Sequence, residues 1–193
     1  GANPTYSSTG FNNIPTIQFT ATSTTSNQGF IMNSPAGTYS NGMYSFVIFQ
    51  KTGTALNQPY GETLFTKTGT GTNNYIPAPF DMYGTTRLIG DGNINHILSG
   101  SGLNISTATG LNLFYISIAP GASNVVIQEY VNGTLGMNTT VSPSSYYIDN
   151  GINLYIGLRG NGDCYNGVMS EVIIYLFLFE TLHKFGCCVR LLS

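Results

Sequence analysis

Charged residues are scarce in this chain of 193 residues: Asp, Glu, Lys and Arg together make up 7% of it, and only six are Lys or Arg. Soluble domains usually carry about 25% charged residues. Six cations are too few to follow a row of phosphates, so nucleic acid is not expected as a main partner. The net charge of −2 also gives little protection against self-association, which suits a protein that forms oligomers or larger assemblies.

Cysteine, tryptophan and long apolar runs are also rare or absent. Cys164 stands apart from the adjacent Cys187 and Cys188; this is a poor disulfide framework without the spacing of a zinc site, so we expect free thiols. The longest apolar run, 172–179, has the length of a strand and is too short to span a bilayer. The opening GANPTYSSTG has neither the basic start nor the apolar core of a secretory leader. Hydrophobic residues nevertheless make up 41% and aromatic residues 12%, which argues against a disordered chain.

Short segments rich in β-branched and aromatic residues recur between clusters of Gly, Asn and Pro, which predicts an all-β protein. Asn132-Gly133 predicts a two-residue hairpin, because a type I′ turn needs positive φ at both central residues. Pro77 and Pro79 predict an edge or a long loop. We expect helix only in short turns and in the tail after Tyr175. The predicted strands are 43–50, 62–66, 86–90, 111–118, 124–131, 152–157 and 168–175.

Several of these segments are apolar on both faces, as in stacked sheets. The core is expected to include Phe46, Ile48, Leu64, Phe65, Ile127, Ile156, Val172 and Ile174. Glu129 shares its face of the segment VVIQEYV with apolar residues. A buried carboxylate would need a partner or a raised pKa, so we favour a bulge or edge position that lets Glu129 reach solvent.

Several segments occur in an order that resembles a known family. YSFVIFQ resembles its early core strand, GETLFTKTG its Leu-Phe pair with a Lys-x-Gly turn, and PFDMYG and RLIGDGN its next two strands. VIQEYVNGT resembles its Tyr-Val-Asn-Gly hairpin, and LYIGLRGNGDCYNGVMSEVIIY its closing element. From about residue 43 to residue 175 the chain is thus similar to the concanavalin A-like, laminin-G-like jelly-roll superfamily.

The resemblance implies an antiparallel two-sheet β-sandwich of the jelly-roll type. SPAGTYSNGMYSFVIFQ and PAPFDMYGTTRLIGDG are further similar to modules in structural proteins of large DNA viruses and phages. We expect one domain over residues 1–193. The tail 176–193, LFLFETLHKFGCCVRLLS, departs from the polar ending of the family, so the resemblance does not extend to it.

Catalytic motifs are not found. The eight acidic residues are too far apart in the sequence for two to share a strand, whereas retaining glucanases on this fold supply their carboxylates from one strand. There is no Gly-x-Ser-x-Gly elbow. His96 is interpreted as part of a polar loop, and His183 lies in the atypical tail. We therefore expect no enzyme; a glycan hydrolase that uses carboxylates from distant strands is one alternative.

Tyrosine, amide and charged side chains gather near two groups of predicted strand ends. We expect the loops 81–93 and 157–166 to meet at one rim and to hold a neutral glycan through aromatic rings and fixed hydrogen bonds. In the alternative interpretation, Arg87 and Arg159 pair with the nearby aspartates and only tie the loops together. The predicted ligand-binding residues are Tyr83, Arg87, Asp91, Asn93, Tyr155, Arg159, Asn161 and Asp163.

Calcium is the one ion that these loops suggest, and no other cofactor is expected. Asp91, Asn93 and Asp163 offer hard oxygen ligands in tight turns, as calcium requires. Asp-Gly and Asn-Gly pairs are also good turn formers in their own right, which is the alternative explanation. Asn104, Asn132 and Asn138 begin Asn-x-Ser/Thr sequons, whose use depends on a secretory route.

The resemblance implies a non-catalytic, lectin-like carbohydrate-binding or adhesion module on a virion or extracellular surface. Its expected partners are glycans or other virion and surface proteins. The first alternative is a purely structural protein, such as a minor capsid or fibre component. A pocket with an aromatic platform and converging polar groups would favour binding, and a large flat apolar face would favour packing.

Overall fold

The computed structural model describes residues 3–20, 28–32, 43–52, 64–66, 87–90, 95–98, 110–141, 154–158, 165–176 and 187–190. Within these ranges the regular structure consists of thirteen strands and no helix, so no described helix could cross a membrane. Every strand pair is antiparallel. The predicted all-β class is confirmed.

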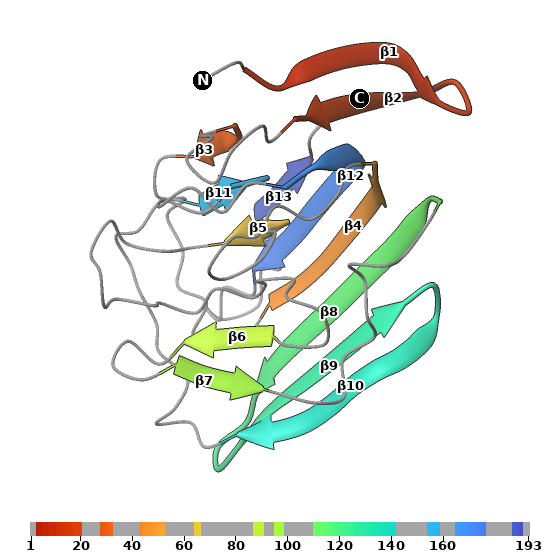
Figure 1. The fold of residues 1–193 in the computed structure, drawn as a ribbon. Helices are drawn as coiled ribbons and strands as arrows, with labels where there is room; N and C mark the ends of the chain where they lie inside the picture. The colour runs from red at the N-terminus through yellow and green to blue at the C-terminus, as the bar shows by residue number, and fades with distance from the viewer. Residues whose placement is uncertain are drawn as a thin grey trace.

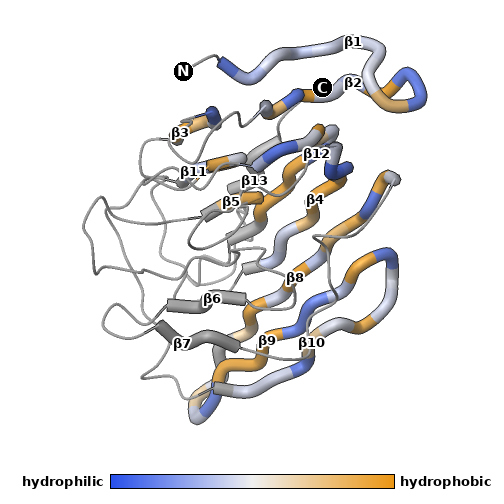
Figure 2. The backbone as a smooth tube through the Cα atoms, in the orientation of Figure 1, coloured by the Kyte–Doolittle hydropathy of each residue, from blue (hydrophilic) through white to orange (hydrophobic). Residues whose placement is uncertain are grey.

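Eight strands form one large sheet, which runs from the upper to the lower part of Figure 1. Its central strands carry most of the apolar sequence, whereas the N-terminal edge strand is mostly pale in Figure 2. The order is β1 (Thr5–Phe11), β2 (Ile14–Phe19), β12 (Gly167–Leu176), β4 (Met43–Lys51), β8 (Asn112–Pro120), β9 (Val125–Val131) and β10 (Thr134–Val141), with β13 (Cys187–Arg190) also paired to β12.

The remaining strands lie to one side of the large sheet, on the left in Figure 1. β11 (Leu154–Ile156) pairs with β3 (Phe30–Met32) and β5 (Phe65–Thr66), and β6 (Arg87–Gly90) pairs with β7 (Asn95–Leu98). Side chains from this side join the core of the large sheet, so two layers enclose one core. The result is an antiparallel β-sandwich, as predicted.

Alternation along each strand gives the large sheet an inner face toward the small sheets and an outer face. β9 shows it most clearly, because buried and partly buried residues alternate along its whole length. The predicted core residues that are buried are Leu64, Phe65, Ile127, Ile156, Val172 and Ile174. Phe46 and Ile48 are only partly buried, so that part of the prediction is wrong. Val47 and Phe49 occupy the inner face of β4 instead.

Glu129 is fully buried, with 0% of its surface exposed, and the prediction that it reaches solvent is wrong. A bulge does occur there, but it lies in the partner strand, between Leu135 and Met137 of β10. β9 therefore keeps its regular alternation, and Glu129 stays on the inner face with Ile127 and Val131. Glu129 makes a polar or electrostatic interaction in the interior, and buried polar groups in proteins generally have such partners.

Two hairpin turns are built on left-handed residues. Asn132 and Gly133 have φ of 51° and 78°, which confirms the predicted turn between β9 and β10. Asn12 and Asn13 have φ of 50° and 62° and form the turn between β1 and β2, a hairpin that was not among the predicted strands. Asn tolerates this region better than other non-glycine residues because its short polar side chain can hydrogen-bond locally.

The other differences from the predicted pattern are local. His96 lies in β7 and not in a polar loop, because 95–98 pairs with 87–90 as a two-stranded ladder. The tail contributes β13, which pairs with the end of β12. Pro77, Pro79 and Cys164 lie outside the described residues.

Candidate functional site

The outer face of the large sheet carries a row of apolar and aromatic residues across five neighbouring strands. Cross-strand pairing places them side by side: Ile173 of β12, Phe46 of β4, Tyr115 of β8, Tyr130 of β9 and Leu135 of β10. Directly paired residues on one face of an antiparallel sheet lie close enough for their side chains to touch. The row is therefore fixed by the register of the sheet.

Three aromatic residues of this row, together with Tyr44 two residues before Phe46 on β4, form what we call the outer-face cluster: Tyr44, Phe46, Tyr115 and Tyr130. The ring centroids of Phe46 and Tyr115 are 4.8 Å apart, and those of Tyr115 and Tyr130 are 5.7 Å apart. The Tyr44 ring lies 6.2 Å from Tyr115 and is nearly parallel to it, at 20°. Such pairs contribute about 0.5–1.5 kcal/mol beyond the area they bury, so each ring limits the motion of its neighbours.

A row of uncharged polar residues runs beside the cluster. Register pairs Ser117 with Tyr44 and Gln128, and Gln128 in turn with Asn138. The Gln128 Nε2 atom lies 3.5 Å from the Asn138 Oδ1 atom and donates to it. Amide groups are thus available within two residues of Tyr130 along β9.

A depression of about 360 Å³ opens at the β8–β9 end of the outer-face cluster, within the usual range of about 300–1,000 Å³ for ligand sites. Leu113, Tyr115, Gln128, Tyr130 and Gly133 line it. Its floor belongs to two paired strands in the middle of a sheet, which is a rigid support for a binding site.

The turn beside the depression is braced by one side chain. Asn132 Oδ1 accepts a hydrogen bond from Leu113 N at 2.8 Å, and Asn132 Nδ2 donates to Asn112 Oδ1 at 2.9 Å. The backbone N of Asn132 also donates to Leu113 O at 2.8 Å. These bonds tie Leu113, which lines the depression, to the turn residue that precedes Gly133. They also occupy the Asn132 amide, which is one of the three sequon residues.

The pKa of Tyr115 is raised above the usual value of 10.0 for a tyrosine. Partial burial of the phenol is the main cause, and the neighbouring Tyr44 and Tyr130 add to it, whereas a hydrogen bond with Ser117 acts in the opposite direction. At neutral pH the phenol is protonated and is able to donate a hydrogen bond. The Tyr115 side chain therefore carries no charge at neutral pH.

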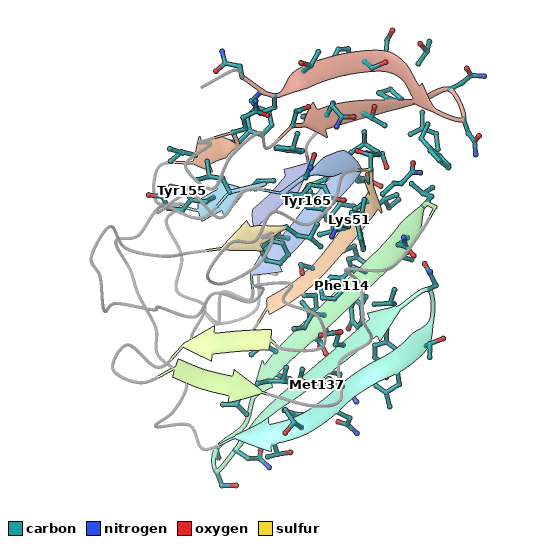
Figure 3. The ribbon with its side chains drawn as sticks, viewed as in Figure 1. Lys51, Phe114, Met137, Tyr155 and Tyr165 are labelled. Atoms are coloured by element: carbon teal, nitrogen blue, oxygen red, sulfur yellow. The ribbon has the colours of Figure 1, made fainter. Side chains whose placement is uncertain are left out.

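The predicted rim site lies mostly outside the described residues: Tyr83, Asp91, Asn93, Arg159, Asn161 and Asp163 are not among them. Arg87 is the first residue of β6. Tyr155 lies in β11, 6% exposed, on the side of the small sheets and away from β8 and β9 (Figure 3). The meeting of the loops 81–93 and 157–166 stays a prediction, and so does calcium binding by Asp91, Asn93 and Asp163.

The carboxylates with described side chains, Glu129 and Glu171, lie on opposite faces of the large sheet. They cannot flank one glycosidic bond as a catalytic pair would. Among the described residues, no group of three His, Cys, Asp or Glu side chains could hold a metal ion. The outer face offers hydrogen bonds, ring stacking and apolar contacts to a ligand.

No family model and no curated protein matches this chain. A search of solved structures finds a similarity to domain 4 of AbnA, a GH43 extracellular arabinanase from Geobacillus stearothermophilus, solved in complex with arabinotriose. The TM-score is 0.54 at 15% identity, over 91% of this chain and 76% of that one. The two share the β-sandwich fold.

Sequence reasoning missed the outer-face cluster, although its residues all lie in strands that it predicted or implied. The available signal was that Tyr44 and Phe46 are two residues apart in one predicted strand, while Tyr115 and Tyr130 each lie in another. Alternation shows that neighbours two apart share a face. It does not show which strands lie side by side, and that pairing is what assembles the cluster.

Proposed function

We propose that the protein is a non-catalytic carbohydrate-binding module that holds a neutral glycan on the outer face of its large sheet. The observation that carries this proposal is the depression beside Tyr115 and Tyr130, with the Gln128 amide at its edge. Flat aromatic rings bury the apolar faces of sugars, and amide and phenol groups satisfy their hydroxyls. No Asp, Glu, Lys or Arg among the described residues lines the depression, which favours an uncharged ligand.

The structural neighbour supports the class of ligand. Domain 4 of the arabinanase was solved with a short neutral oligosaccharide, and its enzyme is extracellular. By analogy we propose glycans as partners of this chain and an extracellular or virion surface as its location. The resemblance to the concanavalin A-like superfamily supports the same reading, and the absence of catalysis is part of the proposal.

An array of neutral oligosaccharides, followed by calorimetric titration of the best binder, tests this function. We expect the Tyr130→Ala variant to lose about tenfold or more in affinity, because aromatic stacking against a ligand ring disappears. Tyr6→Ala is the matched control, since Tyr6 is an exposed tyrosine of β1 at the far edge of the sheet. Equal affinities of wild type and Tyr130→Ala, or glycan cleavage during the titration, would refute the proposal.

A structural role in an assembly is the second candidate, because the edge of the sheet is unprotected. β1 is an edge strand, nearly all of it exposed, and no charged residue occurs in the chain before Lys51. Natural edge strands are usually guarded by charges against pairing with other chains. Sedimentation of the purified protein tests this role: a monomer at high concentration contradicts it, and an oligomer that Tyr6→Lys disperses supports it.

A further inference from the structure

Two exposed leucines stand beside Tyr130, on the outer face. Leu113 is 44% exposed and lines the depression, and Leu135 is 48% exposed and pairs directly with Tyr130 across the β9–β10 ladder. The other large hydrophobic residues that are exposed in the described ranges lie on β1, β2 and β3. Leu113 and Leu135 thus add exposed apolar surface on both sides of Tyr130, on β8 and on β10.

The backbone fixes the positions of both leucines on the outer face. The bulge at Gly136 reverses the alternation of β10, so that Leu135 faces outward although Met137, two residues later, is buried in the core. Both backbone polar groups of Leu113 are hydrogen-bonded to Asn132. The Leu113 N donates to the Asn132 side chain, and the Leu113 O accepts from the Asn132 backbone N. Neither leucine is on a freely moving segment.

The polar groups lie at the end of the depression opposite Leu113. Gln128 stands two residues before Tyr130 on β9, with its amide bonded to Asn138. The depression therefore has an amide end at Gln128 and a leucine end at Leu113, with Tyr115 and Tyr130 between them, and Leu135 lies beside Tyr130 on the neighbouring β10. A sugar that bears only hydroxyls would leave the leucine end in contact with polar groups or water, whereas an apolar group there would be removed from water.

We propose that the ligand is a neutral oligosaccharide that carries an apolar substituent, and that Leu113 and Leu135 hold this substituent beside the sugar ring on Tyr130. Suitable substituents are the methyl group of a 6-deoxy sugar, an O-methyl group or an O-acetyl group. This inference rests on the proposed carbohydrate-binding function and specifies its substrate class. It predicts that one additional buried methyl group raises the affinity about fourfold.

Matched glycan pairs test the inference: O-acetylated xylotriose against the same sample after alkaline deacetylation, and methyl 6-deoxyhexosides against the parent methyl hexosides. Wild-type protein should bind the apolar member of at least one pair about fourfold tighter. Leu113→Ala and Leu135→Ala should each reduce that preference, because the affinity for the apolar member of the pair falls more than the affinity for the parent sugar. Ile14→Ala, an exposed apolar residue on β2, is the matched control and should keep the preference.

The outcomes separate the inference from the function on which it rests. Equal affinities within every pair, together with measurable binding of the parent sugars, would overturn the inference and leave the function standing. A preference that persists in the Leu113→Ala and Leu135→Ala double variant would also overturn it. A dimer that Leu135→Ala dissociates would show that a second copy covers the leucines, and lack of binding to any glycan would refute the function itself.

Discussion

Replacing Asn132 tests whether the β9–β10 turn is held in the way the structure shows. Two side-chain hydrogen bonds are lost in any truncation, and each contributes about 0.5–1.5 kcal/mol to stability. The bond to Leu113 N is exposed, so water partly replaces it and the lower part of that range applies. Asn132→Gly should therefore cost about 1–2 kcal/mol.

Asn132→Ala carries an additional cost because the residue has a φ of 51°. A Cβ in the left-handed region costs about 1–2 kcal/mol unless the side chain compensates by local hydrogen bonding. We expect Asn132→Ala to lose about 2–4 kcal/mol and to be less stable than Asn132→Gly. Urea denaturation of the three proteins, followed by circular dichroism, measures both differences. Equal stability of wild type and Asn132→Ala, or a glycine variant less stable than the alanine variant, would refute this reasoning.

Three further predictions follow from the two faces of the large sheet. Phe114→Ala should cost about 3–5 kcal/mol because Phe114 is fully buried, whereas its neighbour Leu113→Ala should cost below about 1 kcal/mol; similar losses in urea denaturation would contradict the assigned faces. Glu129→Ala should destabilise by more than about 2 kcal/mol and Glu171→Ala by much less, since only Glu129 is fully buried; thermal unfolding that shows the reverse order would be inconsistent with the inner position of Glu129. Because the folded pKa of Tyr115 is raised, its contribution to stability is present below about pH 10 and is lost as the pH rises above it; unfolding measured from pH 9 to 11 should show a smaller alkaline loss in Tyr115→Phe than in wild type, and an identical loss would contradict the shift.

Much of the sheet could be predicted because its central strands carry strong local signals. Segments such as 124–131 alternate and end in Asn-Gly, and both features act within a few residues. β1 and β2 were missed because they are rich in Thr, Ser and Gln, so their pattern resembles that of a surface loop. β13 was missed because a short strand in an atypical tail is decided by its partner, β12.

The candidate site was harder to predict because its parts meet only through long-range pairing. Phe46 and Val47 are consecutive apolar residues of β4, and the local sequence does not show which of the two side chains faces the core. Glu129 was expected to reach solvent because burial of a carboxylate costs free energy. It is buried because β9 keeps its regular alternation, and it makes a polar or electrostatic interaction there. The charged residues of the loops 81–93 and 157–166 were predicted to form the site because charged residues are rare in this chain. The cluster on the open sheet face consists of residue types that are common in any core, so only the cross-strand register distinguishes it.

A crystal structure of the complex with the best array binder would show whether a glycan binds on the outer face of the large sheet. We predict a sugar ring against Tyr130 and Tyr115, with a hydrogen bond from the Gln128 amide and the chain end near Leu113. A glycan bound at the loops 81–93 and 157–166, with the outer face bare, would show that the binding site lies elsewhere.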